Sequence, residues 1–258
     1  MRRLALVVAL ATLAGACSIT ESFDKADGVG LGPDLTWERK VFGAQPHQWA
    51  TLGQRAVYEA SGLGIHEDLQ VPVEQLATDD QVVSIDVHEV TWGGNGGFWV
   101  SVGVGARITL FDDERNYRAY LLEIGRNNQV FPGVTSWTAV LWKVDGIGNE
   151  HVLDAAGTGG TGIQLPGTLT LRVEGSSISG LFTGTSGELS LAATDTDLTS
   201  GVVGLGGGIV VVDDESGTGR VVVDDFAAHD VDAGADSRDA AAFAAGTPGT
   251  GALSGRAA

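Results

Sequence analysis

Aromatic side chains with flat, exposed faces would give this chain an evident binding chemistry. Such rings stack on the apolar faces of sugar rings while neighbouring polar groups hold the hydroxyls. Four residues are the candidates for a ligand-binding face: Trp92, Trp99, Tyr120 and Trp137. The first two flank loop 93–97, which we expect to be the tip of a hairpin. Burial in the core is the alternative for each, and Trp137 and Trp142, of opposite parity on one strand, should face opposite ways.

Two adjacent carboxylates, Asp224 and Asp225, interrupt the apolar stretch VVVDDFAAHDV at 221–231. Alternation along a strand sends neighbouring side chains to opposite faces, so at most one of them points into any shared site. Phe226 shares a face with Asp224 and prefers the core, which favours Asp225 as the site-facing residue. The alternative is that both carboxylates accept hydrogen bonds in a turn or cap the end of a strand.

Other spacings in the chain point to no chemistry. Gly157, Gly159 and Gly162 satisfy a dinucleotide-binding pattern, but no helix follows to direct a dipole at a phosphate. The five histidines are scattered without metal-ligand spacing. No nucleophile-elbow motif is present.

The charge balance excludes some partners. The 258 residues include 33 Asp and Glu against 15 Lys and Arg, a net charge of −18, so nucleic acid is not an expected partner. The same carboxylates could supply oxygen ligands to Ca²⁺. A hydrophobic content of 43% is enough for one sizeable core.

The first residues predict an address outside the cell. Arg2 and Arg3 precede a short apolar run at 4–13 and small residues at 14–16, the layout of a secretory signal peptide. The only cysteine, Cys17, follows Leu-Ala-Gly-Ala. This arrangement resembles the lipobox of bacterial lipoproteins, with Ala14 where that motif usually has Leu. The resemblance implies lipidation of Cys17 and a protein anchored to the cell envelope; an ordinary secretory signal cut at Ala16 is the alternative.

Beyond residue 20 the hydrophobic period is two, which predicts strands. Alternation is clear at 82–88, at 117–122 and at 168–173, with turn residues between such segments. The expected organisation is a signal peptide at 1–16, a lipidated N-terminus and short linker at 17–21, one all-β domain at 22–231 and a disordered Ala/Gly-rich tail at 232–258. The repeat of VVVDD at 210–214 and 221–225 is expected from two neighbouring antiparallel strands.

Three stretches, in this order, resemble the concanavalin A-like (laminin-G-like) domains. They are SFDKADGVGLGPDLTWE (22–38), LTLRVEGSSISGLFTG (169–184), and LTSGVVGLGGGIVVVDD (198–214) with GRVVVDDFAAHDV (219–231). The resemblance implies an antiparallel two-sheet jelly-roll sandwich over about residues 20–231. It does not choose a function, because this fold hosts lectins, carbohydrate-binding modules, adhesins, glycosidases and virion proteins alike.

The resemblance also implies a place for a metal. In a jelly roll the first and last strands lie adjacent, and related carbohydrate-binding modules often hold a structural Ca²⁺ at that corner. Asp24, Asp27 and Asp225 are therefore the candidate calcium ligands.

One stretch is close to a catalytic motif. Laminarinase-like members of the superfamily carry Glu-x-Asp-x-x-Glu on a strand, and Asp86 and Glu89 match its second and third acids. Ser84 stands where the nucleophile belongs, and a serine without an activating base cannot take that role. The sequence therefore favours a non-catalytic protein.

These observations predict a surface-displayed binding module for a carbohydrate or a cell-surface partner, touching the membrane only through its lipid. A phage-related structural or receptor-binding protein is the first alternative, because the opening stretch also resembles domains of phage tail proteins. A glycoside hydrolase is the second.

Overall fold

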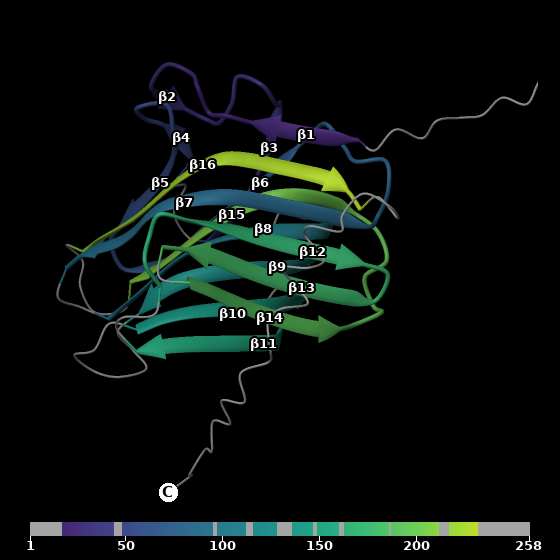
Figure 1. Ribbon diagram of the computed structural model, residues 1–258. Helices are drawn as coiled ribbons and strands as arrows, with labels where there is room; N and C mark the ends of the chain where they lie inside the picture. The colour runs from purple at the N-terminus through teal and green to yellow at the C-terminus, as the bar shows by residue number, and fades with distance from the viewer. Residues whose placement is uncertain are drawn as a thin grey trace, which may run out of the picture.

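The computed structural model describes residues 17–43, 48–94, 97–111, 116–127, 136–146, 149–159, 163–185, 187–211 and 217–231, without the side chains of 39–43, 136, 158 and 159. The predicted signal peptide and the predicted tail lie outside these residues. Every regular element in the described ranges is a β-strand, and all strand pairs are antiparallel. The strands form two sheets that face one another (Figure 1). The predicted all-β jelly-roll sandwich is confirmed.

The larger sheet has nine strands. Its order is β14 (Gly187–Thr194), β13 (Ser177–Gly184), β12 (Gly167–Glu174), β7 (Gln81–Gly93), β16 (Thr218–Asp230), β5 (Ala56–Ser61), β4 (Ala50–Thr51) and β2 (Gly28–Val29), with β1 (Ser18–Glu21) paired to β16. The other sheet has seven: β11 (Glu150–Gly159), β10 (Ser136–Asp145), β9 (Tyr117–Asn127), β8 (Phe98–Leu110), β15 (Val202–Val211), β6 (Gly64–Pro72) and β3 (Trp37–Gly43).

The core lies between the sheets and follows the alternation of the sequence. On β7, Val83, Ile85 and Val87 are buried while the residues between them are half-buried. On β8, Val100 and Val102 belong to the same core, so their neighbours face outward. Period-two patterning therefore fixes which side chains the sandwich buries and which it leaves on its outer faces.

Two predicted hairpins are wrong. The loop that follows Gly93 joins β7 to β8, which belong to different sheets, and β15 and β16 likewise belong to different sheets. The glycines and polar residues of both loops signal a change of direction, but a hairpin and a crossover between layers need the same chemistry. The chain beyond these loops is read correctly as strand in both places.

The first and last strands lie side by side, as the resemblance implied. Strand β1 pairs with β16 from Ser18 opposite His229 to Glu21 opposite Phe226 (Figure 1). Residues 18–21, which were expected to be a linker, are therefore part of the larger sheet. Glu21 is buried, and its carboxylate accepts hydrogen bonds from the backbone N–H groups of Asp34 and Leu35, which folds the N-terminal loop back onto the sheet.

The double aspartate of β16 forms a β-bulge. Asp224 is paired with Asp86 and Ala227 with Ser84, so one extra residue is inserted in β16 between these pairs. Asp225 has φ of 48°, in the left-handed region that Asp tolerates better than most residues. Its N–H donates to the carboxylate of Asp224 at 3.1 Å. The expected alternative, a local hydrogen-bonding role, applies to the Asp224 carboxylate, whereas Asp225 is exposed.

Candidate functional site

A pocket of about 270 Å³ opens on the outer face of the seven-stranded sheet. Strands β6, β8, β9, β10, β11 and β15 all contribute to its lining. Trp99, Ser101 and Gly103 of β8 line it, whereas Val100 and Val102 between them face the core. The pocket therefore lies on the side of the sheet turned away from the larger sheet.

Glycines make the floor of this pocket. Gly103 on β8 is opposite Gly206 on β15, and Gly208 follows two residues later on the same face. Side chains at these positions of a regular sheet would stand up from its surface and fill the space. The space is most open above Gly206, where an added methyl group would have its nearest neighbour at 3.9 Å, whereas the Glu123 side chain lies over Gly103.

Aromatic rings and aliphatic side chains make the walls. Trp99 comes from β8, Tyr117 from β9 and Trp142 from β10. Leu69 and Leu121 join them and belong to a small apolar cluster on the outer face of the sheet, separate from the main core. Proteins commonly bind sugar rings by stacking them on flat aromatic side chains in a small open pocket.

Carboxylates from three strands border the same space. Glu67 lies on β6, Glu123 on β9 and Glu150 on β11. Burial, with the charges of Glu67 and Glu150 added, raises the pKa of Glu123 to about 7, although Trp142 acts in the opposite direction. Burial and the charge of Glu150 also raise the pKa of Glu67 to about 7; because this residue is exposed at the pocket mouth, water moderates the effect. The pocket therefore holds carboxyl groups that titrate near neutral pH.

The hydroxyl of Tyr117 is affected by the same surroundings. Burial raises its pKa, and the charges of Glu67, Glu123 and Glu150 raise it further. The phenol therefore keeps its proton at any physiological pH and remains a hydrogen-bond donor.

The predicted aromatic residues do not form one face. Trp99 lines the pocket. Trp92 stacks on Phe98 with ring centroids 4.9 Å apart and packs against the core. Trp137 also packs against the core, with the Arg126 guanidinium 5.5 Å from its ring centroid.

Tyr120 is fully buried in the core, so its place on a ligand-binding face is wrong. Its hydroxyl donates to Asp195 at 2.5 Å and accepts from the N–H of Leu198 at 3.2 Å, which ties the loop after β14 to the seven-stranded sheet. The expected opposition of Trp137 and Trp142 is confirmed: Trp142 lines the pocket, whereas Trp137 packs against the core.

The predicted calcium corner brings the first and last strands together but gives its acids separate surroundings. Asp27 accepts a hydrogen bond from the N–H of Gly53 at 2.8 Å, while Asp24 and Asp225 are exposed. Asp224 lies 3.6 Å from the Arg55 guanidinium. Among the residues that the structure describes, no group of three or more His, Cys, Asp or Glu is placed to hold a metal ion. A Ca²⁺ there, which stays a prediction, would need backbone carbonyls for most of its ligands.

The near-motif Ser84-Asp86-Glu89 lies on β7 in the larger sheet, away from the pocket. Asp86 accepts a hydrogen bond from the Thr168 hydroxyl at 2.6 Å, and Glu89 accepts one from the Thr91 hydroxyl at 2.8 Å. These carboxylates are engaged in cross-strand and along-strand contacts.

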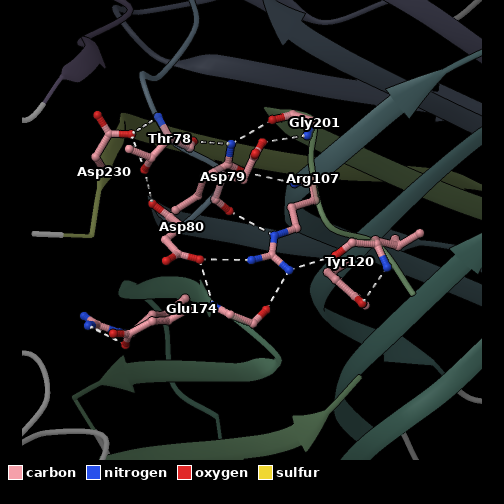
Figure 2. Close-up of polar contacts among 12 residues, drawn as sticks. Thr78, Asp79, Asp80, Arg107, Tyr120, Glu174, Gly201 and Asp230 are labelled. Atoms are coloured by element: carbon pink, nitrogen blue, oxygen red, sulfur yellow. Dashed lines mark hydrogen bonds and ion pairs between the residues drawn. The ribbon is translucent and has the colours of Figure 1, made fainter. Parts of the chain in front are cut away.

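A second, open pocket of about 440 Å³ is lined in part by Arg107. Figure 2 shows the polar contacts of this arginine. Arg107 is only 3% exposed. Its guanidinium donates to the carbonyl oxygens of Asp79, Gly175 and Leu198 and to the carboxylate of Asp80, at 2.7–3.0 Å. With these four bonds the arginine ties three loops together, so we assign it a structural role.

Beside this network, Asp230 fixes the N-terminal end of the domain (Figure 2). Burial alone would raise its pKa, but hydrogen bonds from Thr78, Cys17 and Ala77 outweigh it and lower the pKa. The bond from the Cys17 N–H is 2.9 Å long, and Cys17 itself is exposed. No helix in the described ranges is long and apolar enough to cross a membrane. Lipidation of Cys17 stays a prediction.

The comparisons agree with the fold. No family model matches the sequence, and no curated protein matches it significantly. Among solved structures, the chain is similar to the CBM2 module of the evolved Dit protein of Lactobacillus casei BL23 phage J-1, with 8% identity, 83% of this chain and 96% of that chain covered, and a TM-score of 0.51. It is also similar to a glycoside hydrolase family protein from Mycobacterium thermorestibile, with 11% identity, coverages of 81% and 99%, and a TM-score of 0.50. At these identities the likeness concerns the fold alone.

Proposed function

We propose that the protein is a carbohydrate-binding module that holds a sugar ring in the pocket of the seven-stranded sheet. The observation that carries the proposal is the pairing of a glycine floor with the rings of Trp99, Tyr117 and Trp142. The volume of about 270 Å³ lies just below the range for ligand pockets, about 300–1,000 Å³, so it suits one ring of a glycan. Display on the cell envelope through Cys17 would fit this role.

The two structural neighbours support the fold in which such sites occur, one being a module of a phage protein and the other a glycoside hydrolase family protein. Because the fold hosts both kinds of activity, the choice between them rests on the pocket. A phage-related receptor-binding protein that recognises a host glycan would use the same chemistry.

A matched pair of glycines offers a test that leaves the core untouched. A methyl group added to Gly206 would enter the pocket floor with its nearest neighbour, Leu69 Cδ1, at 3.9 Å, and one added to Gly157 on β11 would meet the carbonyl oxygen of Trp137 at 3.9 Å. Neither substitution strains the backbone, so both variants should fold.

The experiment is a glycan-array screen followed by calorimetry on the full chain. We expect saturable binding of a glycan by the wild type and Gly157→Ala, and binding weakened about tenfold or more by Gly206→Ala and Trp142→Ala, because stacking on a ring contributes roughly 1–2 kcal/mol. A blank array, or equal binding by all variants, would contradict the proposal.

The raised pKa values of Glu67 and Glu123 favour glycoside hydrolysis as the second candidate. Both side chains lean over the floor from opposite sides, since Glu123 Cγ is 2.7 Å from a methyl group added to Gly103 and Glu67 Cγ is 3.9 Å from one added to Gly208. Inverting glycosidases use such a pair as acid and base on either side of the scissile bond. Release of reducing ends from the bound glycan, abolished by Glu123→Gln, would establish this activity; binding without release would exclude it.

A further inference from the structure

We propose that the pocket selects a sugar that carries a positively charged amine over neutral and acidic sugars. This inference rests on the proposed function and deepens it by naming the class of ligand. It follows from the combination of uncompensated carboxyl groups and aromatic faces in one small cavity.

The charged and titratable groups that border the cavity are all acidic or neutral. Glu67 and Asp68 come from β6, Tyr117 and Glu123 from β9, and Glu150 from β11. The described lining residues of β8, β10 and β15 carry no charge, and no Lys or Arg belongs to the described lining. Lys143 of β10 instead binds Asp195 and Asp197, at 3.0 and 2.6 Å.

These carboxyl groups repel one another when ionised, so each makes it harder for its neighbours to lose a proton. The charge of Glu67 contributes to the rise in the pKa of Glu123, and the charge of Glu150 contributes to the rise for both. Asp68 differs, because its carboxylate accepts hydrogen bonds from the N–H of Trp49 and the amide of Gln70. A cation placed over the glycine floor would relieve the repulsion and favour the ionised forms.

The aromatic walls suit the same ligand. A cation over the face of Trp or Tyr is attracted by the ring quadrupole, and this attraction is stronger where water is excluded. Trp99, Tyr117 and Trp142 present such rings beside the carboxyl groups. A neutral sugar would gain only the stacking, and a uronic acid would meet like charge.

The test compares tetramers of glucosamine, N-acetylglucosamine, glucose and glucuronic acid, bound to the full chain and measured by calorimetry at pH 6.5. We expect the glucosamine tetramer to bind roughly tenfold more tightly than the N-acetylated one, from the added cation–π and charge-assisted contacts. Its binding should also release protons, because burial and the neighbouring carboxylates raise the pKa of Glu123 to about 7, so protonated carboxyl groups in the pocket would ionise beside the amine. Repeating the titration in two buffers of different ionisation enthalpy measures the protons released.

Variants distinguish the pocket from the overall charge of −18. The double variant Glu67→Gln with Glu123→Gln should lose the preference for the amine and the proton release while still binding the N-acetylated tetramer. Glu59→Gln, on β5 in the other sheet with its side chain 55% exposed, is the matched control and should behave as the wild type. Thermal melting of each variant verifies folding.

The outcomes separate this inference from the proposed function. Equal or tighter binding of the neutral tetramers without proton release would overturn the inference and leave the proposed function standing. A preference for the amine that survives in the double variant would also overturn it. Failure of every glycan, on the array and in calorimetry, would overturn the proposed function and this inference with it.

Discussion

Glu123 shows how far the surroundings of one residue can depart from what its sequence position indicates. It follows Tyr117, Ala119 and Leu121 on the outward face of β9, and nothing in YRAYLLEIGRN marks it as special. Its titration near neutral pH depends on burial and on Glu67 and Glu150, which come from other strands. A single sequence cannot place three carboxylates of distant segments together, so both Glu67 and Glu123 escaped prediction.

The pKa of Glu123 makes a prediction about stability. Its folded-state pKa of about 7 lies above the ordinary value of 4.5, so between these values the folded chain holds more protons than the unfolded one. The free energy of unfolding should therefore fall as the pH rises from 4.5 to 7 and then level off. We expect Glu123→Gln to flatten this fall and to be more stable than the wild type at pH 8. Urea unfolding midpoints from pH 4.5 to 8 measure the pH dependence of stability for both proteins. Parallel curves for the wild type and Glu123→Gln would contradict the prediction.

At the scale of the element, β16 combines core packing and a β-bulge within the six residues 221–226. Val221 and Val223 anchor it in the core, while the bulge at Asp225 resets the alternation so that Phe226 is also buried. The hydrophobic character of Phe226 predicted its burial correctly. Regular alternation did not predict that Phe226 shares a face with Val221 and Val223, because a bulge inserts a residue that no period-two pattern includes.

The backbone of this bulge should discriminate between residue types. Asp225→Val places a β-branched side chain in the left-handed region and should lower the free energy of unfolding by about 1–2 kcal/mol. Asp225→Asn and Asp225→Gly keep a residue that tolerates this region and should remain within about 0.5 kcal/mol of the wild type. Denaturation in urea measures all three variants, and a stable valine variant would show that the bulge relaxes.

The positions of the strands in the sequence were more predictable than the pairing of the strands in the sheets. Alternation located the segments of β7, β9 and β12, and turn residues located their ends. Which sheet receives the chain after Gly93 depends on packing between layers, a long-range property that local turn chemistry does not encode. The same limit applies to the pocket: Trp99 was a candidate from the sequence and does line it, but Trp142 could be placed there only once β10 is paired with β9.

For the whole molecule, closure at the N-terminus is the feature with the clearest energetic consequence. Strand β1 covers the main chain of β16 beyond the reach of β5, which pairs with β16 only at 218–223. Asp230 then ties the two ends of the domain together by accepting a hydrogen bond from the Cys17 N–H, and Glu21 holds the N-terminal loop by accepting one from the Leu35 N–H.

Removal of residues 1–22 should therefore destabilise the entire sandwich. The uncovered edge of β16 would expose unpaired backbone groups, which also promotes association between molecules. We expect the melting temperature to fall by roughly 5–15 °C, given about 2–4 °C per kcal/mol for a chain of this size. A version that lacks only residues 1–16 is the control. Identical melting of the two shortened chains would show that β1 contributes nothing to stability.

The glycine floor has a consequence for how this surface could change over generations. Gly206 sits where a side chain would alter the depth of the cavity without disturbing the core behind it, since the nearest atom to an added methyl group is 3.9 Å away. A substitution at this position could therefore change what the pocket accepts without changing the sandwich that carries it. A lineage could exchange one ligand for another through a single codon, while the two layers that hold the site stay as they are.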